Sequence, residues 1–112
     1  MEALKVEKKG QVCLMRYSGE LTLEVIDRLK QEIEDYLTDQ DCLTLVMDLS
    51  KTVFLDSSGI GFLVHINNRK KANNKEFYLL KPSAQVQKTL SLVKLIDFFN
   101  ILEDESQLED LK

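Results

Sequence analysis

The sequence predicts an α/β domain with a mixed, four- to five-stranded β-sheet flanked by about four α-helices. Two observations favour this fold class. Apolar residues alternate with polar ones in some segments, and they recur at helical spacing in the segments between. The resulting order is β-β-α-β-α-β-α-β-α, with helices crossing between strands. A length of 112 residues and a hydrophobic content of 44% fit a single domain over residues 1–112.

The first two predicted strands form a hairpin. Leu4 to Lys8 alternates apolar and charged residues, and Val12 to Ser18 resumes the alternation after a short turn. Gly19 to Leu21 leads out of the hairpin, and Thr22 is placed to cap a helix. From Leu23 to Leu37 the apolar residues form one stripe at helical spacing, with charged residues opposite, which predicts an amphipathic helix.

The central part of the chain predicts a buried strand followed by a second helix. Leu43 to Leu49 is the most continuously apolar strand candidate, which is typical of a strand buried on both faces. The helix is expected from Ser58 to Ala72. Asn73-Asn74 closes it, because Asn tolerates the left-handed conformation that ends helices. Glu76 to Leu80 is the next predicted strand.

The C-terminal part predicts a third helix, a short strand and a terminal helix. Val86 and Leu90 stand at helical spacing after the turn at Lys81-Pro82-Ser83. Phe98 to Leu102 is expected to be extended. Ser106 to Glu109 matches a capping box, which predicts a short helix starting there.

Charge and cysteine usage exclude several classes of protein. A net charge of −4 disfavours nucleic acid as a partner, because phosphate backbones require clustered Lys and Arg. The basic cluster Arg69-Lys70-Lys71 is expected to complement a helix C-terminus rather than to form a binding patch. Cys13 and Cys42 lie apart in predicted strand regions and form no CxxC motif, so we expect reduced core residues and no metal site. With no secretory signal and no segment long enough to span a bilayer, a cytoplasmic location is expected.

Catalytic chemistry finds little support in the residues, and no catalytic residue or cofactor is predicted. His65 lies mid-helix without an obvious Ser or Asp partner. Ser58 is not in a G-x-S-x-G elbow, and Gly59 and Gly61 lack the third glycine of a dinucleotide fingerprint. A nucleotide-binding role remains a weaker alternative, because a helix start favours phosphate.

Asp56, Ser57 and Ser58 occupy a predicted strand-to-helix junction. Backbone N–H groups at such a junction are free to face an anion. One interpretation is structural: Asp56 or Ser57 caps the helix, while Gly59 and Gly61 allow close packing. The other is that a kinase modifies Ser57, because a phosphate adding about −1.5 to −2 charge beside Asp56 would repel a partner without unfolding the domain.

The junction also carries a resemblance to a known family. Placed after a hydrophobic strand, Asp56-Ser57-Ser58-Gly59-Ile60-Gly61 resembles the signature of the STAS domain, and more narrowly that of the bacterial anti-sigma factor antagonists. The resemblance covers nearly the whole chain. Three further segments support it: Gly19-Glu20-Leu21, Val46-Met47-Asp48-Leu49-Ser50 and Pro82-Ser83-Ala84-Gln85-Val86. The chain departs from the family pattern at three places, namely Thr22, Asn73-Asn74 and Lys94-Leu95-Ile96.

The resemblance implies a STAS fold and a phosphorylation switch. A serine kinase that is also an anti-sigma factor would phosphorylate the first serine of the pair, which is Ser57. The unphosphorylated protein would bind that partner and free a sigma factor, and a serine phosphatase would reverse the mark. The expected contact residues are Asp56, Ser57, Ser58, Gly59, Ile60, Gly19, Glu20 and Thr22. The alternative is a constitutive STAS scaffold or accessory subunit of a transport or signalling assembly, and the oligomeric state stays open.

Overall fold

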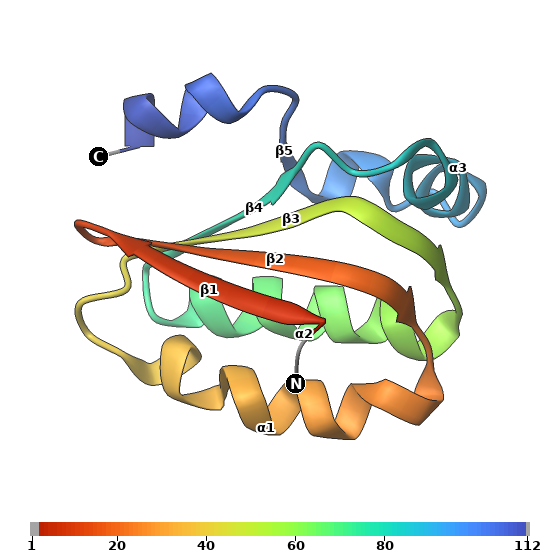
Figure 1. The fold of residues 1–112 in the computed structure, drawn as a ribbon, viewed down its shortest axis with the longest axis horizontal. Helices are drawn as coiled ribbons and strands as arrows, with labels where there is room; N and C mark the ends of the chain where they lie inside the picture. Colours follow the sequence, from red (N-terminus) through yellow and green to blue (C-terminus); the bar gives the residue numbers. More distant parts are fainter. Residues whose placement is uncertain (1–2, 112) are drawn as a thin grey trace.

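The computed structural model describes residues 3–111 and confirms the predicted α/β class (Figure 1). Five strands and three α-helices alternate along the chain, and two 3-10 helices, η1 and η2, complete it. Their bounds are β1 Leu4–Lys9, β2 Val12–Leu21, α1 Leu23–Thr38, β3 Thr44–Leu55, α2 Ser57–Ala72, β4 Glu76–Leu80, α3 Ala84–Leu92, η1 Ile96–Phe98, β5 Asn100–Leu102 and η2 Glu105–Leu111.

The sheet is mixed, and its strands follow one another in chain order. β1 pairs with β2 antiparallel, whereas β2–β3, β3–β4 and β4–β5 are parallel pairs. Figure 1 shows α1 and α2 side by side on one side of the sheet, with η2 on the other. None of the helices in the described part of the chain has the length and apolar character that crossing a membrane requires.

Two apolar clusters fill the two faces of the sheet. Because side chains alternate along a strand, Cys13, Met15 and Tyr17 of β2 point into the main core beneath α1 and α2. Val12 and Leu14 point the other way, into a smaller cluster that η2 covers. Both cysteines are buried free thiols, as predicted, and burial is the first cause that raises the pKa of Cys13 to about 12.

Two strands are longer than predicted, and this changes the surroundings of the serine junction. β2 continues past Ser18 to Leu21, and β3 continues past Leu49 to Leu55. The two extensions pair with each other in parallel, with register shifts at Arg16–Ser18 and at Gly19–Glu20. By composition, both extensions look like connecting loops. They form strands because each provides the hydrogen-bonding partner of the other.

The helix boundaries also differ from the predictions. α2 begins at Ser57, one residue earlier than expected, while Asn74 closes it with a left-handed φ of 59°, as predicted. Residues 96–98 form a 3-10 helix, so the predicted strand over 98–102 is reduced to residues 100–102. The capping-box prediction is wrong: the helix starts at Glu105, and the Asp104 carboxylate accepts from the Ser106 N–H at 2.9 Å.

The basic cluster Arg69-Lys70-Lys71 does not form one patch. Arg69 makes a double hydrogen bond to Glu34 of α1, at 2.9 and 3.0 Å. Lys70 is fully buried and donates to the carbonyl oxygen of Tyr36 at 3.0 Å. These side chains fasten the end of α2 to α1, and all three basic residues lie in the last turn of α2, as predicted.

Candidate functional site

Asp56 joins the starts of two helices. As the N-cap of α2, its carboxylate accepts from the Gly59 N–H at 3.0 Å, and it also accepts from the Leu23 N–H in the first turn of α1 at 3.1 Å. The hydrogen bond from Gly59 is the first cause that lowers the pKa of Asp56, and that from Leu23 adds to it. Thr22 occupies the N-cap position of α1 as predicted, but its side chain makes no capping bond.

The paired serines lie in the first turn of α2. Ser57 is exposed and Ser58 is half-buried. Within residues 3–111 no hydrogen bond engages either hydroxyl, since the capping bond to Gly59 comes from Asp56. The structure thus decides between the two candidate caps, and it leaves the Ser57 hydroxyl free.

At Gly59, α2 packs closely against the ends of β2 and β3. A Cβ at this position would lie 2.2 Å from the Leu21 carbonyl oxygen and 3.0 Å from the Leu55 Cβ. At Gly61 an added Cβ would meet nothing within 4 Å. The prediction that both glycines allow close packing holds for Gly59 and is wrong for Gly61, which is exposed to solvent.

The Gly19–Thr22 segment lies against the serine junction, as the resemblance implied. Glu20 and Leu21 pair with Phe54 and Leu55 in the parallel ladder, and the Asp56 N–H donates to the Leu21 carbonyl oxygen at 3.2 Å. The structure therefore brings the predicted contact residues into one region, where the C-terminal ends of β2 and β3 meet the starts of α1 and α2 (Figure 1). Their role in binding a partner stays a prediction.

Three apolar side chains near this region are exposed, and the sequence analysis did not identify them. Leu23 is 70% exposed, Val53 61% and Phe54 42%, although large apolar residues are usually covered. Leu23 is the first residue of α1 and lies beside Asp56. Val53 and Phe54 lie near the end of β3, shortly before Asp56 in the chain. The run Thr52 to Leu55 of β-branched, aromatic and aliphatic residues was the available signal for this strand extension.

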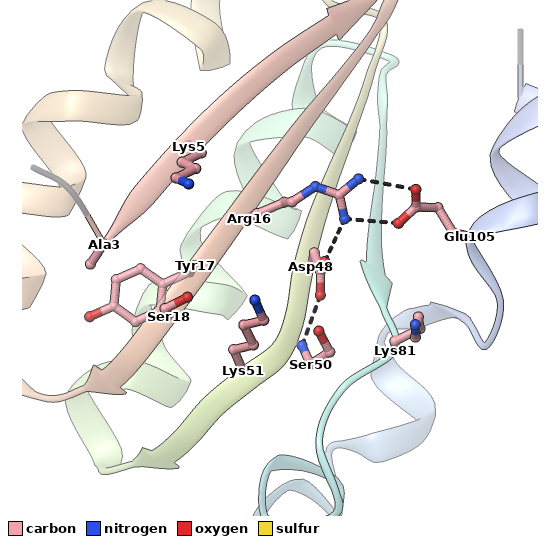
Figure 2. A pocket seen from close by; sticks show the side chains of 10 residues that line it. All are labelled: Ala3, Lys5, Arg16, Tyr17, Ser18, Asp48, Ser50, Lys51, Lys81 and Glu105. Atoms are coloured by element: carbon pink, nitrogen blue, oxygen red, sulfur yellow. Dashed lines mark hydrogen bonds and ion pairs between the residues drawn. The ribbon is translucent and has the colours of Figure 1, made fainter.

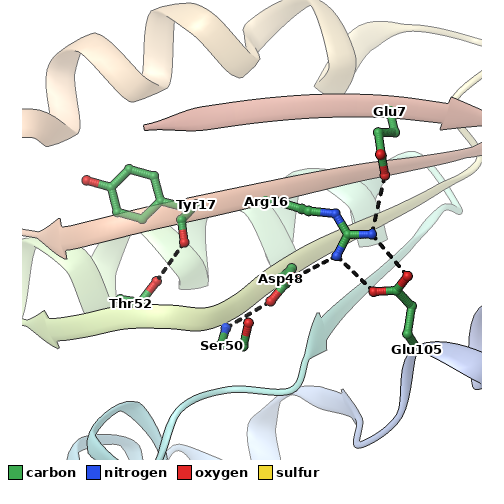
Figure 3. A network of polar contacts seen from close by, with 7 residues as sticks. All are labelled: Glu7, Arg16, Tyr17, Asp48, Ser50, Thr52 and Glu105. Atoms are coloured by element: carbon green, nitrogen blue, oxygen red, sulfur yellow. Dashed lines mark hydrogen bonds and ion pairs between the residues drawn. The ribbon is translucent and has the colours of Figure 1, made fainter. Parts of the chain in front are cut away.

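A second polar cluster, which sequence reasoning also missed, lies on the face of the sheet that η2 covers (Figure 3). The Arg16 guanidinium donates to Asp48 at 2.8 Å and to the two oxygens of Glu105 at 2.8 and 3.1 Å. The Ser50 N–H donates to the other Asp48 oxygen at 2.9 Å. Burial acts to raise the pKa of Asp48, but the bonds from Ser50 and Arg16 outweigh it and hold that pKa below its ordinary value.

Among the residues that the structure describes, no group of three or more His, Cys, Asp or Glu could hold a metal ion. The chemistry of the serine junction is instead that of a free hydroxyl at a helix N-terminus, next to a capping carboxylate.

Residues 3–108 match the STAS domain, and the chain belongs to that family. A curated relative, the anti-sigma F factor antagonist of Paenibacillus polymyxa, is 25% identical over 104 residues that span 91% of this chain and 87% of that protein. The mixed five-stranded sheet and its flanking helices agree with this assignment.

Solved structures show the same fold. A putative anti-sigma factor antagonist from Thermotoga maritima superposes with a TM-score of 0.87 at 21% identity, over 96% of this chain and 92% of that one. The unphosphorylated form of the anti-sigma factor antagonist SpoIIAA gives 0.81 at 21% identity over 97% and 96%. The phosphorylated form of SpoIIAA, a Bacillus cell fate determinant, gives 0.77 at 20% identity over 98% and 100%.

Proposed function

We propose that this STAS domain is an anti-sigma factor antagonist controlled by phosphorylation of Ser57. In its unphosphorylated form it binds a serine-kinase anti-sigma factor in the cytoplasm, and the sigma factor is released. Phosphorylation of Ser57 by that partner ends the binding, and a serine phosphatase restores it. The domain acts as a ligand and a kinase substrate rather than as an enzyme.

The observation that carries this proposal is that Asp56 and Ser57 have different roles at the start of α2. Asp56 caps α2, whereas the Ser57 hydroxyl is exposed and engaged by no hydrogen bond within the described residues. A kinase can therefore reach the hydroxyl without breaking a native contact. A phosphate placed there lies at the N-terminus of a 16-residue helix, where the helix dipole favours negative charge.

The surroundings of Ser57 explain why a phosphate would stop binding. Leu23 and Phe54 expose apolar surface beside the junction, and burial of such surface is a main source of affinity between proteins. A phosphate adds about −1.5 to −2 charge and would have to lose its hydration against that surface. It would also lie next to the Asp56 carboxylate, so a partner that fits the unmodified surface is repelled.

The family comparisons support the same interpretation. SpoIIAA is an anti-sigma factor antagonist whose structure is known in both phosphorylated and unphosphorylated forms, and both forms resemble this chain. The P. polymyxa relative is likewise an antagonist of an anti-sigma factor. These likenesses favour a phosphoswitch over a constitutive scaffold.

The test compares three variants in pull-downs from lysate of the native host, with captured proteins identified by mass spectrometry. Wild type, Ser57→Ala and the matched control Ser58→Ala are expected to retain an ATPase-type serine kinase, and Ser57→Asp is expected to lose it at least about tenfold. With the captured kinase and ATP, phosphate should appear on wild type and Ser58→Ala but not on Ser57→Ala.

A thermal melt of each variant tests whether a loss of binding is caused by unfolding. Because Ser57 is exposed, Ser57→Asp should melt within a few degrees of wild type. Unfolding of Ser57→Asp would make the loss of binding structural and would overturn the switch. Capture of the same non-kinase proteins by every variant would favour the scaffold alternative.

A further inference from the structure

The face of the sheet that η2 covers contains a cavity of about 310 Å³ (Figure 2). Strands β1, β2 and β3 form its floor, and Lys81 after β4 and Glu105 of η2 form one wall. The volume lies at the lower end of the range for small-molecule sites. The cavity is separate from the serine junction, because Ser57 and the other junction residues do not line it.

Strand register builds the floor of this cavity. Lys5 of β1 is paired with Arg16 of β2, which is paired with Asp48 of β3, so three charged residues form one row across the sheet. The same face is apolar nearer the start of β2 and β3, where Val12 and Val46 lie in the cluster that η2 closes. The polar row is thus a distinct region at the edge of that cluster.

The carboxylates in the cavity are already occupied. Asp48 and Glu105 both accept from Arg16, and Glu7 lies 3.4 Å from the same guanidinium (Figure 3). Both oxygens of Glu105 are engaged by the two ends of the guanidinium fork. The planar guanidinium of Arg16 is therefore already paired with a carboxylate inside the protein.

Besides Arg16 and the two carboxylates, three lysines line the cavity. Lys5, Lys51 and Lys81 come from three different segments, and Figure 2 shows Lys5 and Lys51 on the side of Arg16 away from Glu105. Within the described residues no hydrogen bond or ion pair engages the ammonium group of Lys5 or Lys51, and Asp104 lies near Lys81. Four cationic and two anionic side chains thus line a cavity in a chain whose net charge is −4.

We propose that this cavity binds a small multivalent anion, and that a phosphate group is the chemistry it fits best. Lysine ammonium groups act as point charges that can approach a tetrahedral anion from different directions, whereas planar carboxylates are matched by the fork of an arginine. Here the arginine fork is occupied, whereas the ammonium groups of Lys5 and Lys51 have no hydrogen bond or ion pair within the described residues. The hydroxyls of Ser18 and Ser50 also line the cavity and supply further donors.

The test is a titration of the isotope-labelled protein with sodium pyrophosphate at constant ionic strength. Binding is monitored through the NMR chemical shifts of the backbone amides. Saturable shifts are expected at Ser18, Lys51 and Lys81. Lys51→Ala should weaken the affinity about tenfold, the loss expected when a hydrogen bond to a charged group is removed. Lys30→Ala is the matched control, because Lys30 is exposed on α1 on the other side of the sheet and should leave the affinity unchanged.

Three outcomes would overturn the proposal. The first is the absence of saturable shifts at the cavity residues. The second is an equal loss of affinity in Lys51→Ala and Lys30→Ala, which would indicate general attraction of anions to lysines. The third is that citrate, a multivalent carboxylate, binds as tightly as pyrophosphate, which would contradict the preference for phosphate. The amide spectrum of each variant reports whether it is folded, and none of these outcomes depends on phosphorylation of Ser57.

Discussion

The Asp56 cluster and the Arg16 cluster are both polar, but they are built differently. Asp56 bonds to Gly59 three positions away, within the helix that it caps, and to the Leu23 N–H at the start of α1, 33 positions away. Arg16 bonds to Asp48 and Glu105 over separations of 32 and 89 positions. The first cluster leaves a serine hydroxyl free at the surface, whereas the second engages its carboxylates with the arginine. Under the proposed function the Asp56 cluster carries a reversible mark at Ser57, because no hydrogen bond among the described residues depends on that hydroxyl.

Gly59→Ala should have the largest effect on stability. The added methyl would lie 2.2 Å from a backbone oxygen, so α2 would have to move away from the strand ends. We expect a loss of about 3 kcal/mol or more in the free energy of unfolding, at the upper end of the cost of overpacking. Urea denaturation at neutral pH measures it.

Gly61→Ala is the matched control in the same helix. The added methyl meets nothing within 4 Å, so the substitution should stabilise the protein by about 0.5–1 kcal/mol through helix propensity alone. Equal effects of the two substitutions would contradict the close approach at Gly59.

Asp48→Asn tests the Arg16 cluster. The variant keeps an acceptor for Ser50 but removes the charge beside a partly buried guanidinium, and we expect a loss of about 2 kcal/mol at pH 7. The measurement is urea denaturation at pH 7 and at lower pH. A loss within experimental scatter would show that Glu105 alone satisfies Arg16.

The pH dependence follows from the direction of the pKa shift. Because the folded protein holds the pKa of Asp48 below its ordinary value, its contribution is complete above about pH 4, where the unfolded carboxyl ionises. That contribution is lost as the pH falls below 4 through the folded pKa. Wild type should therefore lose more stability on acidification than Asp48→Asn does.

Asp56→Ala should have a smaller effect, because the carboxylate is more exposed than that of Asp48. The substitution leaves the Gly59 and Leu23 N–H groups without their acceptor, although water can replace it. The thermal midpoint should fall by a few degrees. Asp56→Ser, which retains a capping oxygen, should recover part of the loss, and a failure to do so would mean that the bond to Leu23 matters more than the cap.

The sequence predicted those features that local patterns specify. Asp56 at a strand-to-helix junction, Asn74 at a helix end and the alternation in β2 all depend on neighbours within a few residues. The extensions of β2 and β3 were missed because Gly19 and Glu20 in one segment, and Ser50 and Lys51 in the other, interrupt the apolar pattern. The pairing of one extension with the other stabilises both as strand.

The Arg16 cluster could not be found in the same way. Its members come from β2, β3 and the C-terminal η2, and nothing in their spacing relates them. A charged residue on the same strand face as Leu14 was the only local signal. The site at Ser57 was found partly from its own residues and partly from a family resemblance, whereas the lysine cavity required the sheet register.

Glu105→Gln should have the smallest effect and separates the two carboxylates of the Arg16 cluster. The hydrogen bond from Arg16 is the first cause that lowers the pKa of Glu105, but the Glu105 side chain is 45% exposed, and solvent screens the pair. Arg16 keeps Asp48 in the variant, so we expect a loss of less than about 1 kcal/mol by urea denaturation. The amide resonance of Leu108 reports in parallel whether η2 remains packed on the sheet. A loss as large as that of Asp48→Asn would mean that the ion pair, rather than the apolar contact of Leu108, holds η2 in place.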